Sequence, residues 1–250
     1  MSTSTDEAHN IIEAAWLDQE RVFDQIYQNG IKAYMKTIGN IEPAFHLKDR
    51  NLRCIDDGVP GGIHLPGAGI FLDKKEMIEF AKNAQIEGIY SHADCGACQL
   101  YAQDKHLNIN KVDEYAKELD IEVAHDLGVV YKGHIAIQDM RRPSGLHPTR
   151  VIYYDGTGNF DYSQVAELPS GFTISRKYLK PKSAQEAVNV AMSIILGEHG
   201  FGNKITEEHP LLLVPMGDNF SLEQLNDELA ECGAKYQSRV KIDGFAYPLV

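Results

Sequence analysis

Short apolar segments alternate with longer amphipathic segments over most of this chain, and that alternation constrains the fold more than any other feature of the sequence. The apolar segments have the length of strands, whereas the amphipathic ones have the length of helices and repeat their apolar residues every three or four positions. Strands that are separated by helices form mostly parallel sheets. The sequence therefore predicts an α/β fold, with a mostly parallel central sheet flanked by helices.

Turn and capping residues set the boundaries of the expected elements. Asp73 with Glu76, and Ser183 with Glu186, form side-chain pairs that begin helices, and Gly128 is a typical helix end. The expected strands are residues 52–56, 86–91, 133–138, 150–155, 211–215 and 236–242, and the expected helices are residues 73–85, 97–106, 111–127, 183–197 and 221–232.

Glycine and proline interrupt the pattern in two further segments. Residues 58–69 are rich in both and are expected to be a loop. Residues 155–159 read Asp-Gly-Thr-Gly-Asn, which is a turn sequence. They predict a hairpin or tight reversal between residues 151–154 and 160–165.

The chain divides into three consecutive parts. Apolar residues spaced three and four apart up to Gly30 predict an N-terminal helical arm within residues 1–44, which packs on the main body or on a second subunit. Residues 45–182 form the α/β core. Residues 183–250 repeat the strand and helix pattern and are expected to be a strand-helix-strand extension of the same domain.

The charge and the cysteine content exclude several classes of protein. With 24 Lys and Arg against 36 Asp and Glu the net charge is −12, which disfavours a nucleic-acid-binding protein because such proteins neutralise phosphates with basic residues. No apolar stretch is long enough to span a membrane, and the N-terminus lacks the basic and apolar regions of a secretory signal. We therefore expect a cytoplasmic protein whose four cysteines are reduced and serve as metal ligands, catalytic groups or core residues.

The residues that predict chemistry lie at the ends of two expected strands. Cys54 and Asp56 share one face of the first strand because side chains alternate along a strand, and His92 and Cys95 follow the next one. The carboxyl ends of parallel strands meet at one edge of a sheet, where α/β proteins place their ligand sites. Two thiolates and an imidazole favour zinc over magnesium or calcium, with the fourth position left for water or for Asp56. The alternative is that these are buried packing residues.

The spacing Cys54-x-Asp56 followed by His92-x-x-Cys95-Gly96 resembles the zinc signature of the beta-class carbonic anhydrases. The resemblance implies a fold like theirs, with Zn²⁺ held by Cys54, His92 and Cys95 and with Asp56 as a catalytic residue beside the fourth position. It also implies a lyase that hydrates CO2 reversibly to bicarbonate by zinc-bound hydroxide. A small-molecule substrate and a homodimer or higher homo-oligomer, with the active site completed at the subunit interface, are further expectations from the resemblance.

The chain departs from the family pattern in two ways: the family carries Arg two residues after the Asp, where this chain has Gly58, and the interval from Cys54 to His92 is shorter than expected for the family. Strand alternation turns Arg53 away from Asp56. Three other arginines are candidates for the missing charge: Arg141, Arg142 and Arg150. Without a cationic partner, Asp56 either completes a closed metal shell that has no water to activate, or orients a bound water. Two alternative functions follow: a catalytically silent zinc-binding protein, or a zinc hydrolase of another small electrophile such as carbonyl sulfide or carbon disulfide.

Two nearby residues have open roles. Cys98 follows Cys95 in a C-x-x-C spacing, which is found in redox dithiols, and the alternative is a core or supporting position. His64 in the glycine-rich segment is either a proton shuttle, because its ordinary pKa lies near neutrality, or a loop residue without a role. The glycines of that segment are expected to let the backbone pass close to the metal site.

Overall fold

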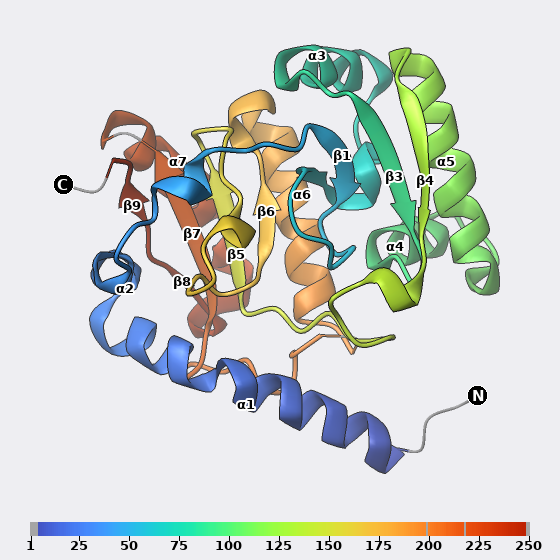
Figure 1. The fold of residues 1–250 in the computed structure, drawn as a ribbon. Helices are drawn as coiled ribbons and strands as arrows, with labels where there is room; N and C mark the ends of the chain where they lie inside the picture. Colours follow the sequence, from blue (N-terminus) through green and yellow to red (C-terminus); the bar gives the residue numbers. More distant parts are fainter. Residues whose placement is uncertain (1–4, 199, 218, 249–250) are drawn as a thin grey trace.

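Every strand pairing in the described part of the structure is parallel. The computed structural model describes residues 5–198, 200–217 and 219–248 (Figure 1). Its strands are β1 (Asn51–Cys54), β2 (Ile63–Leu65), β3 (Gly88–His92), β4 (Val130–Ile135), β5 (Val151–Asp155), β6 (Phe172–Ile174), β7 (Leu211–Gly217), β8 (Val240–Ile242) and β9 (Phe245–Ala246). One sheet has the order β2-β1-β3-β4 and the other has the order β6-β5-β7-β8, with β9 paired to β7. The predicted class, an α/β protein with parallel strands flanked by helices, is confirmed.

The helices cover the two sheets from both sides (Figure 1). They are α1 (Thr5–Asn29), α2 (Ile31–Thr37), α3 (Lys74–Ala84), α4 (Gly96–Asp104), α5 (Val112–Leu127), α6 (Pro181–Ile195) and α7 (Asn219–Gly233), and short 3₁₀ segments include residues 66–69 and 162–164. Two local signals are confirmed. The Asp73 carboxylate accepts the N–H of Glu76 at 2.9 Å where α3 begins, and Gly128, with a φ of 67°, ends α5.

A shared hydrophobic core joins the two sheets. The largest group of buried apolar residues includes Leu52 and Ile89 of the first sheet together with Ile152 and Leu213 of the second. β2 also lies beside β6, so the two sheets are neighbours along their edges. This packing places the segment that leads into β5 close to the carboxyl ends of β1 and β3, where the candidate site lies.

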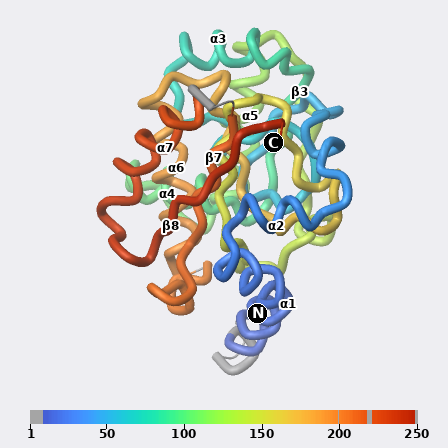
Figure 2. Tube along the Cα trace, turned by 90° about the vertical axis from the view of Figure 1, so that its left-hand side faces the viewer, coloured from blue at the N-terminus to red at the C-terminus, as the bar shows by residue number. Residues whose placement is uncertain are grey.

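The N-terminal helices cover the opposite face of the second sheet. Phe23 of α1 is fully buried in a second core with Tyr153 and Val214. The guanidinium carbon of Arg150 lies 3.6 Å from the centre of the Trp16 ring and 4.3 Å from that of Phe23. The expected helical arm therefore packs on the main body of its own chain, while the N-terminal end of α1 extends beyond that body (Figure 2).

Two expectations about irregular segments are wrong. Residues 160–165 form no strand, because the Asp155 carboxylate accepts the N–H groups of Thr157 at 2.8 Å and Phe160 at 3.0 Å and so holds a turn that leads away from the sheet. The glycine-rich segment 58–69 is not wholly a loop, because Ile63–Leu65 pairs with β1 as strand β2.

Several boundaries also differ from those expected. Helix α6 begins at Pro181, two residues before the expected Ser183 cap, because proline is well suited to the first turn of a helix. β4 begins at Val130, shortly after the Gly128 turn and three residues before the expected start. Of the strand expected at residues 236–242, only the last three residues form β8, because residues 234–239 form a 3₁₀ segment. β7, within the expected C-terminal extension, pairs with β5 over residues 212–216 and thus lies inside the second sheet.

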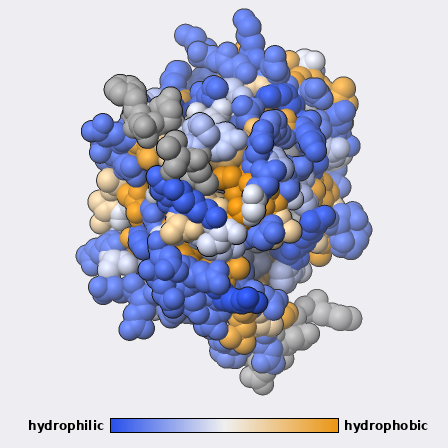
Figure 3. Space-filling view, turned by 60° about the vertical axis from the view of Figure 1, so that its left-hand side comes forward, coloured by the Kyte–Doolittle hydropathy of each residue, from blue (hydrophilic) through white to orange (hydrophobic). Residues whose placement is uncertain are grey.

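The molecular surface agrees with the composition. On the face drawn in Figure 3 hydrophilic residues predominate and hydrophobic ones gather in small patches. Among the described residues, no helix is both long enough and apolar enough to cross a lipid bilayer.

Candidate metal centre

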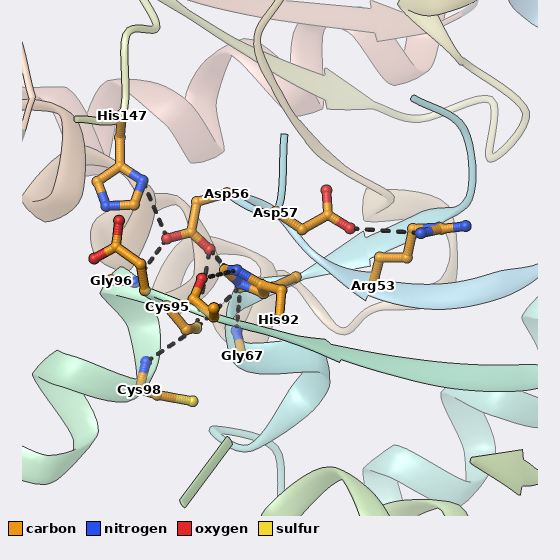
Figure 4. Close-up of polar contacts among 12 residues, drawn as sticks. Arg53, Asp56, Asp57, Gly67, His92, Cys95, Gly96, Cys98 and His147 are labelled. Carbon is orange, nitrogen blue, oxygen red and sulfur yellow. Dashed lines mark hydrogen bonds and ion pairs between the residues drawn. The ribbon is translucent and has the colours of Figure 1, made fainter. Parts of the chain in front are cut away.

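The four residues singled out by the sequence converge on one point. Cys54 ends β1, Asp56 lies two residues beyond it, His92 ends β3, and Cys95 is the residue before α4. All four are buried, and one ligand atom from each lies within 4.8 Å of the other three. Figure 4 shows the side chains of Asp56, His92 and Cys95 pointing toward one another. This buried group could hold a metal ion.

The sulfur–sulfur separation within this group fits tetrahedral coordination, whereas Asp56 Oδ1 lies nearer to His92 Nε2 and farther from Cys95 Sγ, at 4.0 Å, than a regular tetrahedron requires. Zinc–sulfur bonds of about 2.3 Å and zinc–nitrogen or zinc–oxygen bonds of about 2.0–2.1 Å place the ligand atoms of a tetrahedron about 3.3–3.8 Å apart. The sulfurs of Cys54 and Cys95 are 3.6 Å apart, and His92 Nε2 lies 3.1 Å from Asp56 Oδ1. Cys54 Sγ approaches Asp56 Oδ1 more closely, at 2.7 Å, as a thiol that donates to a carboxylate.

The orientation of the His92 ring also fits a metal ligand. Its Nδ1 lies 2.8 Å from the carbonyl oxygen of Ala93, to which it can donate. That contact leaves Nε2, which is directed into the group, as the nitrogen that can bind a metal once its proton has left, and a hydrogen bond of this kind is the usual device that orients a metal-binding histidine. Nε2 is buried without a hydrogen-bond partner among the described residues, which a metal ion would provide.

Main-chain N–H groups support both sulfurs. Gly67 donates to Cys54 Sγ at 3.0 Å, and Cys98 donates to Cys95 Sγ at 3.3 Å. Gly67 has a φ of 53°, and a Cβ there would lie 2.6 Å from the Ile70 side chain, so the close approach requires glycine. The expectation that the glycine-rich segment passes close to the site is confirmed, and Cys98 supports Cys95 through its backbone.

The Asp56 carboxylate is held from two sides. Its Oδ1 faces the sulfurs and His92, whereas its Oδ2 accepts the N–H of Gly96 at 2.7 Å and lies 3.3 Å from His147 Nδ1 (Figure 4). A Cβ at Gly96 would come within 3.0 Å of the same oxygen, so glycine is needed there too. His147 was not found from the sequence, because it lies in an irregular segment 91 positions after Asp56 with no local pattern around it.

Arg142 reaches Asp56 from another segment of the chain. It donates from Nε to the carbonyl oxygen of Asp56 at 2.7 Å and from Nη1 to the Asp94 carboxylate at 2.9 Å. A Cβ at Gly58 would meet the Arg142 side chain at 3.0 Å, so the glycine leaves room for this arginine. Of the three candidate arginines, Arg142 therefore reaches the main chain of Asp56, while Arg150 lies beneath α1.

Arg53 lies on the other side of its strand, as alternation predicts. Its guanidinium is 3.2 Å from the Asp49 carboxylate and 3.8 Å from that of Asp57. Figure 4 shows Asp57 turned away from Asp56 and toward Arg53. His64 is buried and its Nε2 lies 4.0 Å from Asp57 Oδ1. This histidine therefore lies beside Asp57 and not among the four residues of the candidate metal centre.

Burial and charge set the protonation of these four side chains. Burial raises the pKa of Asp56, but the neighbouring His92 charge outweighs it and holds that pKa well below the usual range. Burial lowers the pKa of His92, and the Asp56 carboxylate more than reverses this effect. Burial raises the pKa of Cys54 and of Cys95 well above that of a free thiol. A metal ion must therefore displace protons from the imidazole and from both thiols when it binds.

A cavity of about 390 Å³ opens beside Asp56 and His147. Its wall combines polar groups, including Asp57, His64 and Arg141, with apolar side chains from the segment that precedes β6. A small molecule in this cavity would lie next to the side of Asp56 that His147 contacts.

Comparisons with known proteins identify no relative: no family model matches the chain, and no curated protein and no solved structure is similar to it.

Proposed function

We propose that this protein is a zinc-dependent lyase similar to the beta-class carbonic anhydrases, which hydrates CO2 reversibly to bicarbonate. The observation that carries the proposal is the convergence of Cys54, His92 and Cys95 with Asp56 in one buried group. Two thiols and an imidazole select zinc over magnesium and calcium, which prefer oxygen ligands. When bound, zinc would supply the Lewis-acid chemistry that makes a water molecule a nucleophile near neutral pH.

Asp56 is the residue that accepts and orients the proton of the attacking water. Its Oδ1 faces the metal-binding group, while Gly96 N–H and His147 hold its Oδ2. Because Oδ2 is held in place, Oδ1 has a defined direction. The lowered pKa of the Asp56 carboxyl keeps it ionised and able to accept a hydrogen bond. Asp56 thus orients the reacting proton without the adjacent arginine of the family.

The cavity provides the approach for CO2. Val59 and Phe172 contribute apolar surface to its wall, which suits an uncharged linear molecule, and His147 contributes a polar group beside Asp56. Bicarbonate, the charged product, would meet polar groups of the same wall, including Arg141. The site is therefore equipped for an apolar substrate and a polar product.

The position of Asp56 Oδ1 also favours a second candidate. At 3.1 Å from His92 Nε2 it occupies the place of a fourth ligand, and a shell of four protein ligands is typical of structural zinc. A chain that keeps Asp56 on the metal at all times would be a catalytically silent zinc protein. Carbonyl sulfide or carbon disulfide is the alternative substrate if the site opens without hydrating CO2.

Metal analysis and a stopped-flow CO2-hydration assay test the proposal. We expect about one zinc per chain, hydration that a chelator abolishes, and loss of zinc in Cys54→Ala and Cys95→Ala. Cys98→Ala is the matched control, because the variant keeps the backbone N–H that donates to Cys95 Sγ, and it should keep its zinc. Folded protein without metal would contradict the zinc site. Zinc-loaded protein with no hydration rate above buffer would contradict the proposed CO2-hydrating activity. Carbonyl sulfide would then be the next substrate to assay.

We further propose, from the same resemblance, that the protein is cytoplasmic and works as a homodimer or higher homo-oligomer. Light scattering coupled to size-exclusion chromatography measures the mass directly. A mass of one chain at assay concentration would contradict the oligomer.

A further inference from the structure

The cavity beside the candidate metal centre is larger than CO2 requires. At about 390 Å³ it has room for roughly a dozen water molecules, since each occupies about 30 Å³ in the liquid. Binding sites for organic molecules start at about 300 Å³ and combine apolar walls with a few directed polar groups. The wall here has that character, because Val165, Leu168 and Phe172 are buried apolar residues that line it.

One positive charge in the wall is left without a compensating partner. The Asp57 carboxylate lies between Arg53 at 3.8 Å and His64 at 4.0 Å, and Arg142 is paired with Asp94 at 2.9 Å. Arg141 is exposed, and in the described part of the chain only its main-chain N–H takes part in a hydrogen bond, with the carbonyl of Gly58 at 2.9 Å. Its guanidinium is therefore available to an incoming anion.

Tyr162 provides a second donor in the same wall. Its ring stacks on Tyr153 with centroids 6.0 Å apart, which fixes the side chain. Burial raises the pKa of the Tyr162 hydroxyl well above its usual value, so the group stays protonated and can donate. Arg141 and Tyr162 both line the cavity.

We propose that this cavity binds a small organic carboxylate, whose charge is held by Arg141 and Tyr162 and whose apolar body lies against Val165, Leu168 and Phe172. A guanidinium binds a carboxylate through two parallel hydrogen bonds. A single arginine with Asp57 close by suits a monoanion better than a doubly charged phosphate. None of these residues belongs to the group of Cys54, Asp56, His92 and Cys95, although Asp56 lines the same cavity, so carboxylate binding can be measured without the metal.

Calorimetric titration with benzoate tests the proposal, with benzamide as the neutral isostere and phenyl phosphate as the dianion. We expect benzoate to bind one to one and about tenfold or more tightly than either competitor, since charge-assisted pairs are the stronger ones. Arg141→Gln should weaken benzoate binding about tenfold and remove the preference over benzamide. Arg21→Gln, an exposed arginine of α1, is the matched control and should bind like the unaltered protein.

Two further measurements locate the ligand. Ala166 lines the cavity and is exposed, so Ala166→Trp should block the cavity and abolish binding without disturbing the core. Protein from which a chelator has removed the metal should bind benzoate with unchanged affinity, whereas a carboxylate bound to the metal itself would be lost. Equal affinity for benzoate and benzamide, tighter binding of phenyl phosphate, or binding that survives both Arg141→Gln and Ala166→Trp would overturn the proposal.

Discussion

His147 is the residue that fixes the second oxygen of Asp56 within the candidate site, at 3.3 Å from Nδ1. We predict that His147→Ala keeps its zinc, because the metal-binding atoms are untouched, and lowers kcat/KM for CO2 hydration about tenfold because Asp56 loses its direction. His147→Gln, whose amide can still donate, should recover much of the rate. Stopped-flow assays across pH measure both variants. Equal loss in the two would mean that the ring only fills space.

Asp120 of α5 shows how one buried carboxyl makes stability depend on pH. It is 3% exposed, and its Oδ1 has no hydrogen-bond partner among the described residues. Burial raises the pKa of this carboxyl well above 3.8, so the folded protein holds a proton that the unfolded chain releases near pH 4. By linkage, the free energy of unfolding then falls as pH rises from about 4 through the folded pKa.

Asp120→Asn should therefore raise the free energy of unfolding at pH 7 by about 1–2 kcal/mol, because asparagine carries no ionisable group that burial must keep neutral. The gain should vanish below about pH 4, where Asp120 is protonated in both the folded and the unfolded protein. Urea unfolding at pH 7 and at pH 3.5 measures it. Asp126→Asn near the end of the same helix makes the same chemical change with the opposite expectation: its carboxylate accepts from Lys74 at 2.7 Å, which lowers its pKa, so this variant should lose stability at pH 7. A gain that is equal at both pH values would refute the argument.

At the scale of elements, α1 is attached to the body by an arginine among aromatic rings. Arg150 is fully buried, and its guanidinium carbon lies 3.6 Å from the Trp16 ring centre and 4.3 Å from that of Phe23. We predict that Trp16→Ala lowers the free energy of unfolding by about 3 kcal/mol, through lost packing and the loss of this cation–π contact. It should also expose α1 to limited proteolysis.

Leu17→Ala is the control on the same helix, because Leu17 is 60% exposed and surface substitutions change stability by about 0.5 kcal/mol or less. Denaturant midpoints and the rate of cleavage within α1 distinguish the two variants. If Leu17→Ala and Trp16→Ala have the same effect, α1 is not attached through this contact.

The elements that the sequence predicted well are those with local signals. The Asp73 carboxylate begins α3 and Gly128 ends α5 through contacts within a few residues, and Cys54 and Asp56 share a side of the strand end because alternation is a local property. The strands β2 and β6 are three residues each and depend on pairing with β1 and β5, which a local pattern does not reveal. His147 reaches Asp56 for the same reason, through long-range packing of the two sheets.

At the scale of the whole molecule, the candidate metal centre connects the two sheets. Cys54 and His92 end strands of the first sheet, while His147 leads into β5 of the second and contacts Asp56. A ligand that binds only the folded state stabilises it by about 2.7 kcal/mol at 100 times its Kd. For a chain of this size that corresponds to a rise in Tm of roughly 5–10 °C.

We therefore predict that chelation lowers the Tm by about that amount while the protein still unfolds in a single transition, because the sheets share one core as well as the site. Cys95→Ala, which lacks a ligand, should already have the lower Tm and should not respond to the chelator. Cys98→Ala should respond as the unaltered protein does, because it keeps the N–H that supports Cys95. Calorimetry with added zinc and with chelator measures all three proteins. Two separate transitions after metal removal would show instead that the metal, and not the core, holds the sheets together.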